Sequence, residues 1–160
     1  DFRSTILVIF KSYILLIMDT YPEYDWDIKK FRNNGYSKGQ IEWLSYLSVE
    51  TPDIRHILNH PDGEYIIPNT KYKADGFSEK EKTVFEFDGD AYHGNPKLFD
   101  SNQKSFFSDK TYGELYNNTL KRKEEIKELG LKVVSVWEMD WKRGKKALIK
   151  LQRIFKKNFI

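Results

Sequence analysis

The amino-acid sequence predicts one domain of the α/β or α+β class, in which helices pack on a mixed β-sheet. Its 160 residues suit a single domain, since a domain of about 150 residues buries roughly 68–70% of its unfolded surface. Segments with helical and strand-like apolar spacing follow in the order helix, three strands, helix, strand, helix. Glycine and proline punctuate the chain between several of these segments.

The first quarter of the chain is predicted to hold an extension and the start of a capped helix. Residues 4–18 form an apolar run that fits one helix or a buried hairpin, and periodicity does not decide between them. Residues 19–36 are aromatic and polar and indicate a connector. Ser37 and Gln40 match a capping box, in which each side chain accepts a hydrogen bond from the backbone of the other residue. They predict a helix that runs to about Leu47.

Three strands are predicted next, at residues 65–67, 71–77 and 82–88. The third strand alternates most clearly and places Phe85 and Phe87 on one face. Glu86 and Asp88 lie on the opposite face. Residues 89–113 are predicted as a long loop, which in a compact domain is more often functional than idle.

The C-terminal part is predicted to be helix, strand and helix. Residues 114–129 have helical spacing and end before Gly130, in the usual position for a helix stop. The nearly all-apolar residues 131–137 predict a strand buried on both faces. The last helix is predicted to have apolar residues on one side and lysines on the other.

Charge is distributed unevenly along the chain. There are 27 Lys and Arg against 24 Asp and Glu, for a net charge of +3. Residues 141–160 carry eight basic residues and no acidic one, which leaves −5 on the rest of the chain. A basic segment on an acidic body favours a polyanion held near a carboxylate-rich site, and the alternative is a solvated helix face.

Composition excludes several classes of protein. Without cysteine there is no disulfide framework and no Cys-ligated metal site, and the absence fits a reducing compartment, so we expect an intracellular protein. The apolar residues 5–18 are interrupted by Lys11 and are shorter than the ~20 residues of a membrane span, so no membrane partner is expected. A basic start and a cleavage site, which a signal peptide needs, are missing. The chain begins with Asp1, which leaves open whether it is part of a longer protein.

Acidic side chains gather in the middle of the chain. If the strands that carry Asp75 and Glu86 are neighbours, their ends meet at one edge of the sheet, with Asp88 on the same face as Glu86. Three carboxylates would repel one another there unless a cation lies between them, and oxygen ligands suit Mg²⁺ or Mn²⁺. His93 follows, and its ordinary pKa suits proton transfer. The alternatives are a solvated strand face for the acids and a surface position for the histidine.

The order of these residues resembles the PD-(D/E)xK nucleases. Asp75 is followed, after ten intervening residues, by Glu86-x-Asp88. The run Val-Phe-Glu-Phe-Asp-Gly-Asp-Ala-Tyr-His-Gly-Asn-Pro at 84–96 is more specifically similar to the very-short-patch mismatch-repair endonucleases and to homing endonucleases built on their catalytic domain. A basic helix and then Gly-Leu-Lys-Val-Val-Ser-Val-Trp-Glu at 130–138 follow in the same order as in that family.

This resemblance implies a restriction-endonuclease-like fold, a mixed β-sheet flanked by helices. The catalytic core would cover residues 37–141, between an N-terminal extension at 1–36 and a basic C-terminal helix at 142–160. The implied activity is metal-dependent hydrolysis of phosphodiester bonds in DNA, with Mg²⁺ as cofactor and Mn²⁺ as a substitute.

The resemblance also assigns roles to single residues. It implies that Asp75 is the principal metal ligand and that Glu86 is the second acid of the motif. Asp88 stands where the repair enzymes have a histidine that hydrogen-bonds metal-bound water, and these three acids form the implied metal site. His93 matches their general acid or base, and Glu42 resembles a helix-borne acid that contacts metal-bound water.

Asp88 stands in place of the lysine that is usual in this motif. The resemblance therefore implies that His93 or Arg122 supplies the proton or the positive charge of that lysine. Arg122 shares a helical stripe with Leu115 and Ile126, which predicts that it faces the carboxylates or a bound phosphate. The alternative is a buried stem with its charged head in water. The residues expected to contact DNA are Tyr92, Lys145, Lys146, Lys150 and Arg153.

Mismatch specificity does not transfer from the repair enzymes. Their cysteine-ligated zinc has no counterpart here, and residues 95–113 do not match their aromatic wedge. Two other functions stay open. One is a non-catalytic nucleic-acid-binding module of a larger protein, and the other is a structure-specific nuclease of recombination.

Overall fold

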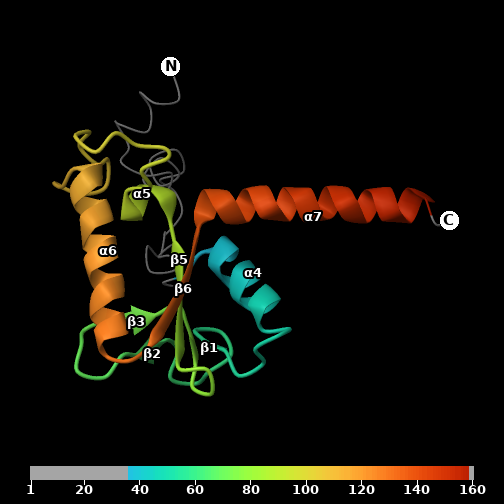
Figure 1. Ribbon diagram of the computed structural model, residues 1–160, viewed down its shortest axis with the longest axis horizontal. Helices are drawn as coiled ribbons and strands as arrows, with labels where there is room; N and C mark the ends of the chain where they lie inside the picture. The colour runs from blue at the N-terminus through green and yellow to red at the C-terminus, as the bar shows by residue number, and fades with distance from the viewer. Residues whose placement is uncertain (1–35, 159–160) are drawn as a thin grey trace, which may run out of the picture. The chain divides into compact units, whose positions relative to one another are not determined.

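The computed structural model describes residues 36–158, with side chains for residues 36–148 (Figure 1). Its centre is a four-stranded sheet in the order β1 (Arg55–His56), β4 (Gly76–Ser78), β5 (Thr83–Asp88), β6 (Lys132–Trp137). A second, two-stranded sheet pairs β2 (Tyr65–Ile66) with β3 (Lys73–Ala74). The helices are α4 (Lys38–Leu47), α5 (Asp90–His93), α6 (Tyr112–Glu128) and α7 (Glu138–Asn158). The predicted α/β class is therefore confirmed.

Some of the sequence-based expectations concern residues beyond this description. The apolar run at 4–18 and nearly all of the connector at 19–36 lie outside the described residues. So do the side chains of Lys150 and Arg153, although both residues belong to α7. In the described part of the chain, no helix has both the length and the apolar character that crossing a membrane requires.

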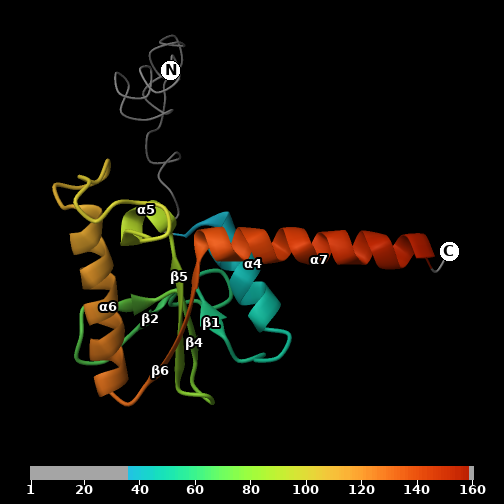
Figure 2. The same ribbon diagram turned by 45° about the horizontal axis from the view of Figure 1, so that its top comes forward.

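Strand β5 organises the main sheet. It runs antiparallel to β4, with Gly76 opposite Phe85, and parallel to β6, with Asp88 opposite Trp137. Parallel neighbours need a crossover connection, and α6 lies on the chain between β5 and β6. In both views α6 covers one face of the sheet and α4 lies on the other (Figures 1 and 2).

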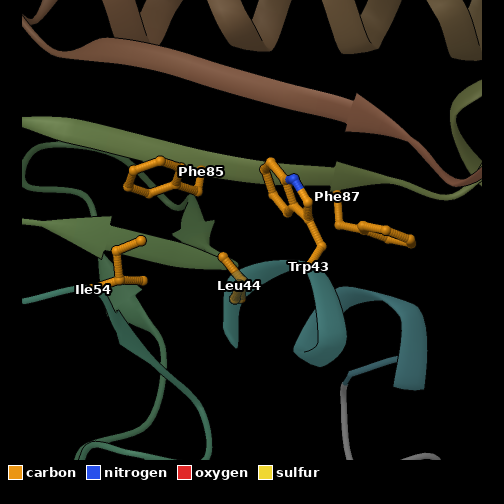
Figure 3. Packing of buried hydrophobic residues seen from close by; sticks show 5 residues of the cluster. All are labelled: Trp43, Leu44, Ile54, Phe85 and Phe87. Carbon is orange, nitrogen blue, oxygen red and sulfur yellow. The ribbon is translucent and has the colours of Figure 1, made fainter. Parts of the chain in front are cut away.

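The alternation predicted for β5 is present, and both of its faces are buried. Phe85 and Phe87 pack into a cluster with Trp43 and Leu44 of α4 and with Ile54 (Figure 3). On the other face, Val84 belongs to a second cluster that includes Ile126 of α6.

Glu86 and Asp88 share the α6 face with Val84, because alternate residues of a strand point the same way. Glu86 is only 5% exposed and Asp88 only 1%. The alternative of a solvated strand face for these acids is therefore wrong.

The absence of a side chain at Gly76 lets β4 approach α4. A Cβ atom at this position would lie 2.5 Å from Cδ2 of Leu44 and 3.3 Å from Cγ2 of Ile54, both in the buried core. Overpacking of a dense core costs about 1–3 kcal/mol. We therefore expect Gly76→Ala to lower the free energy of unfolding by about that amount, measured by urea titration.

Gly144→Ala is the matched control for this substitution. A Cβ atom at Gly144, within α7, would meet nothing within 4 Å. Alanine in a helix interior is favoured over glycine by roughly 0.5–1 kcal/mol, so this variant should be slightly more stable than the wild type. Equal urea midpoints for the two variants would contradict the packing described for Gly76.

Strand β6 differs from the sequence-based prediction of a strand buried on both faces. It lies at the edge of the described sheet, and Val134 is 42% exposed. Its apolar residues pack only in part, because the described chain provides a hydrogen-bonding neighbour on one side alone.

The predicted loop at 89–113 contains more structure than the sequence indicates. Its first residues form the short helix α5, and a bridge pairs Lys104 with Thr111. Thr111 caps α6 in a second capping box with Glu114, so this helix begins two residues before the predicted 114. Helix α7 starts directly after β6, at Glu138, rather than at residue 142.

Candidate active site

Asp75 lies at the junction of the two sheets, between β3 and β4. Gly76 pairs with Phe85, so Asp75 lies beside Glu86 at the end of β5. An Oδ atom of Asp75 accepts a hydrogen bond from the backbone N–H of Phe87 at 2.7 Å, which fixes the carboxylate against β5. The predicted meeting of strand ends at one edge is present, although Asp75 precedes its strand instead of ending it.

The surroundings of Asp75 disfavour the negatively charged form of its carboxyl group. Burial raises its pKa to about 7, and the negative charges of Glu86 and Glu64 add to the shift. The Phe87 N–H and the charge of Arg122 act in the opposite direction. Asp75 forms no ion pair with any described residue. Of the three acids, Asp75 is therefore the one whose negative charge is not balanced by an ion pair with a described residue.

Arg122 of α6 holds the second acid. Its Nη2 atom donates to Oε1 of Glu86 at 2.7 Å and to the backbone oxygen of Lys73 at 2.7 Å. Its guanidinium carbon lies 4.6 Å from the centre of the Tyr72 ring. Burial raises the pKa of Glu86, and the contact with Arg122 opposes the increase. Arg122 thus contacts the carboxylates, as its position on the helix predicts, and its head is not in bulk water.

Lys123 is a site residue that the sequence reasoning missed. Its Nζ atom lies 2.5 Å from Oδ2 of Asp88 and 2.8 Å from Oγ of Ser135 on β6. The Lys123 side chain is only 15% exposed. Helical spacing contains a signal for it, because Lys123 falls between the buried Thr119 and Ile126 at steps of four and three residues.

His93 is positioned by close packing of α5 on α6. Gly94 ends α5 with φ +67°, and a Cβ atom there would lie 2.1 Å from the backbone oxygen of Tyr112. Only glycine permits this approach, which brings Nδ1 of His93 within 3.0 Å of the Thr119 hydroxyl. The same Nδ1 lies 3.8 Å from an oxygen of Asp88.

The hydrogen bonds of Thr119 assign the tautomer of His93. The Thr119 hydroxyl donates its single proton to the backbone oxygen of Leu115 at 3.0 Å, so it accepts from Nδ1 of His93. The neutral ring therefore carries its proton on Nδ1 and a lone pair on Nε2. Among the described residues, none forms a hydrogen bond with that Nε2.

The surroundings of His93 favour its neutral form. Burial lowers the pKa of the imidazole, and the positive charges of Lys123 and Arg122 lower it further, against the opposing charge of Asp88. At neutral pH the ring is thus a base with a free acceptor nitrogen. This arrangement can accept a proton from a water molecule, as a general base does.

Glu42 is engaged elsewhere. Its Oε2 lies 2.5 Å from Nζ of Lys145 on α7, and this contact holds the pKa of Glu42 below its ordinary value. No contact among the described residues joins Glu42 to Asp75 or Glu86. The described contacts therefore do not join Glu42 to the acidic cluster. Glu42 pairs instead with Lys145, which is one of the lysines expected to contact DNA.

The other residues expected to contact DNA are exposed where they are described. The Tyr92 side chain is 63% exposed, and its ring stacks on that of Phe107 with centroids 4.8 Å apart. Phe106, at 78% exposure, belongs to the same loop. Lys146 is exposed on α7.

The acidic cluster lacks a complete set of side-chain ligands for the expected cation among the described residues. Within residues 36–148, no three His, Cys, Asp or Glu side chains are arranged to hold a metal ion. Arg122 pairs with Glu86, and Lys123 pairs with Asp88. Each acid nevertheless keeps one oxygen free of hydrogen bonds from the described residues. Mg²⁺ takes one or two carboxylates and completes its shell with water and phosphate. Asp75 and Glu86, which lie beside each other across β4 and β5, would supply carboxylates of that kind.

Comparisons with protein-family models, with curated proteins and with solved structures find no match to this chain.

Proposed function

We propose that this protein is a metal-dependent endonuclease that hydrolyses phosphodiester bonds in DNA on a restriction-endonuclease-like fold. The observation that carries the proposal is His93, whose free Nε2 belongs to a ring packed beside a group of three acids and two basic residues, of which Glu86 and Asp88 are buried and the others half-buried. Buried, mutually perturbing ionisable groups of this kind are costly to keep and are concentrated at functional sites.

Asp75 and Glu86 would hold Mg²⁺, and Mn²⁺ has the same preference for oxygen ligands. When bound, the ion supplies positive charge to the scissile phosphate. Arg122 and Lys123 add two further positive charges at the same place and would stabilise negative charge that develops on the phosphate. Nε2 of His93 would take a proton from the attacking water.

Lys123 would take the place of the lysine that the PD-(D/E)xK motif normally has two residues after Glu86. Asp88 stands where that lysine is expected, and Lys123 reaches Asp88 from α6 instead. We therefore assign to Lys123, rather than to His93 or Arg122 alone, the positive charge that the resemblance requires.

A non-catalytic nucleic-acid-binding module is the second candidate. The observation that favours it is the pairing of Glu86 with Arg122 and of Asp88 with Lys123. These ion pairs balance the charge of two of the three acids without a metal ion. In this function the cluster would be structural, and DNA would bind through the basic helix and the exposed aromatic residues.

Cleavage of supercoiled plasmid DNA by the full chain separates the two candidates. An endonuclease relaxes or linearises the plasmid in Mg²⁺ and leaves it intact in EDTA, whereas a binding module retards it without cutting. Branched and flapped oligonucleotides in the same assay distinguish a structure-specific nuclease, which would cut these and spare the plasmid. Binding without cleavage of any of these substrates in Mg²⁺ or Mn²⁺ would reject the nuclease proposal.

Removing basic residues from α7 is expected to weaken DNA binding without changing its preference for sequence. In the triple variant Lys146→Gln, Lys150→Gln, Arg153→Gln, the slope of log K against log salt should flatten by up to about 2.7, since each phosphate contact contributes about 0.9. Lys145 is left in place because it pairs with Glu42. Fluorescence anisotropy at several salt concentrations measures the slope.

The matched control removes three exposed lysines from the far ends of β5 and β6: Lys80→Gln, Lys82→Gln, Lys132→Gln. This variant loses the same charge but should keep the wild-type slope. Equal flattening in both triple variants would show that net charge, and not a site on α7, governs binding.

A further inference from the structure

Glu64 lies beside Asp75, at the edge of the proposed cation site. It directly precedes β2, whose first residue, Tyr65, pairs with Ala74. Continuing this antiparallel register by one residue places Glu64 opposite Asp75. The negative charge of Glu64 is also among the causes that raise the pKa of Asp75, which agrees with a short separation. Asp75 therefore has an acid on each side, Glu64 from β2 and Glu86 from β5.

The backbone that carries Glu64 is fixed by Arg55 of β1. The Arg55 Nε donates to the backbone oxygen of Gly63 at 3.1 Å, and its Nη2 donates to that of Glu64 at 3.3 Å. The guanidinium carbon of Arg55 lies 5.6 Å from the centre of the Tyr65 ring, which stacks on the buried Phe77 of β4 at 3.8 Å. These contacts tie the start of β2 to the main sheet, so the Glu64 side chain starts from a fixed point.

The carboxylate of Glu64 has no bonded partner in the described part of the chain. The residue is half-buried, and its side chain forms neither an ion pair nor a hydrogen bond with a described residue. The charge of Arg122 acts on it, but the Nη2 of Arg122 is bound to Glu86. Of the four acids gathered here, Glu86 and Asp88 have basic partners, whereas Glu64 and Asp75 have none. Two unbalanced carboxylates, when ionised, match the charge of one divalent cation.

This arrangement suits a carboxylate that acts on the cation through water. Because no three His, Cys, Asp or Glu side chains of residues 36–148 are arranged to hold a metal ion, Glu64 is not placed as a third direct ligand. Mg²⁺ keeps several water molecules when one or two carboxylates bind it, and a neighbouring carboxylate with free oxygens accepts hydrogen bonds from them. We infer that Glu64 accepts hydrogen bonds from water bound to the cation at Asp75 and so positions that cation. The inference rests on the proposed function and adds a positioning residue to its cation site.

The test measures Mg²⁺ binding without DNA, so that it does not depend on cleavage. Urea titration of the full chain at a series of Mg²⁺ concentrations and constant ionic strength gives the Kd of Mg²⁺ from the rise in the free energy of unfolding. Glu64→Gln should raise this Kd by roughly 10–100-fold, the usual effect of losing a group that holds the surroundings of a metal. In EDTA this variant should be as stable as the wild type or more stable, because repulsion with Asp75 is removed.

Two further variants define how Glu64 acts. Glu64→Asp keeps the charge and shortens the side chain by one methylene group, which weakens a hydrogen bond to metal-bound water. Its Kd should lie between those of the wild type and Glu64→Gln. Glu79→Gln is the matched control, since it removes the same charge from an exposed residue that follows β4, at the opposite end of that strand from Asp75. It should keep the wild-type Kd.

The outcomes separate this inference from the proposed function. An unchanged Kd in Glu64→Gln would overturn the inference even if the wild type binds Mg²⁺ and cuts plasmid DNA. A wild-type Kd in Glu64→Asp, or an equal increase in Glu79→Gln, would show that charge alone acts and would overturn it as well. A Kd that rises in Glu64→Gln and partly recovers in Glu64→Asp supports it even if the plasmid stays intact. If Mg²⁺ does not stabilise the wild type, the inference and the proposed cation site are both wrong.

Discussion

Replacing Asp75 by Asn is expected to abolish DNA cleavage in Mg²⁺. Asparagine keeps the shape of the side chain and an oxygen that can accept from the Phe87 N–H, and it loses the charge that a cation requires. The acidic cluster then keeps only Glu86 and Asp88, each of which already has a basic partner. Single-turnover cleavage of plasmid DNA measures the effect.

The control for this variant is Asp62→Asn, which removes the same charge from a side chain that is 76% exposed. Asp62→Asn should cut DNA at the wild-type rate. Residual cleavage by Asp75→Asn within a few fold of the wild-type rate would contradict the role given to Asp75.

The same substitution should make the metal-free protein more stable at neutral and higher pH. The pKa of Asp75 is raised from 3.8 to about 7, so the folded protein holds a proton that the unfolded chain has already lost between these values. Stability contributed by Asp75 therefore falls as pH rises from about 4 to about 7 and stays low above that range. Urea titration in EDTA should show Asp75→Asn more stable by on the order of 4 kcal/mol at pH 8, with the difference vanishing near pH 4.

His93→Ala is expected to lower the cleavage rate by roughly 10²–10⁴, the usual contribution of a general acid or base. The substitution removes the imidazole that packs against Thr119 and Asp88. Because the pKa of His93 is lowered, the neutral base predominates at pH 7, and the wild-type rate should fall only as pH drops below 6.5. Single-turnover rates across the pH range, at saturating Mg²⁺, measure both effects.

His60→Ala is the control for the histidine, since its ring accepts a hydrogen bond only from the local Asp62 N–H. It should keep the wild-type rate. A His93→Ala variant that retains the rate and the pH profile of the wild type would remove His93 from the reaction.

Local patterns in the sequence predict much of the structure around the site. The capping box at Ser37 and Gln40 forms as predicted, because it depends on residues within one helical turn. The alternation of β5 predicts which side chains share a face, and the position of Arg122 on its helix predicts its contact with the acids.

Long-range pairing accounts for what the sequence does not predict. An apolar run such as 131–137 fits a central or an edge strand equally well, and only the pairing order places β6 at the edge. Strand β1 has two residues, too few for a period. The inward turn of Lys123 depends on how α6 is rotated over the sheet, and two adjacent basic residues in a charged helix do not reveal that rotation.

We propose that the acids around Asp75 hold the divalent cation on which cleavage depends. Thermal unfolding of the wild type and of Asp75→Asn, each in Mg²⁺ and in EDTA, tests it most directly. A ligand at one hundred times its Kd stabilises the protein that binds it by about 2.7 kcal/mol. Mg²⁺ should therefore raise the unfolding midpoint of the wild type and leave that of Asp75→Asn unchanged. If Mg²⁺ raises neither midpoint, or raises both equally, the cluster is not a metal site and the proposed metal-dependent endonuclease is wrong.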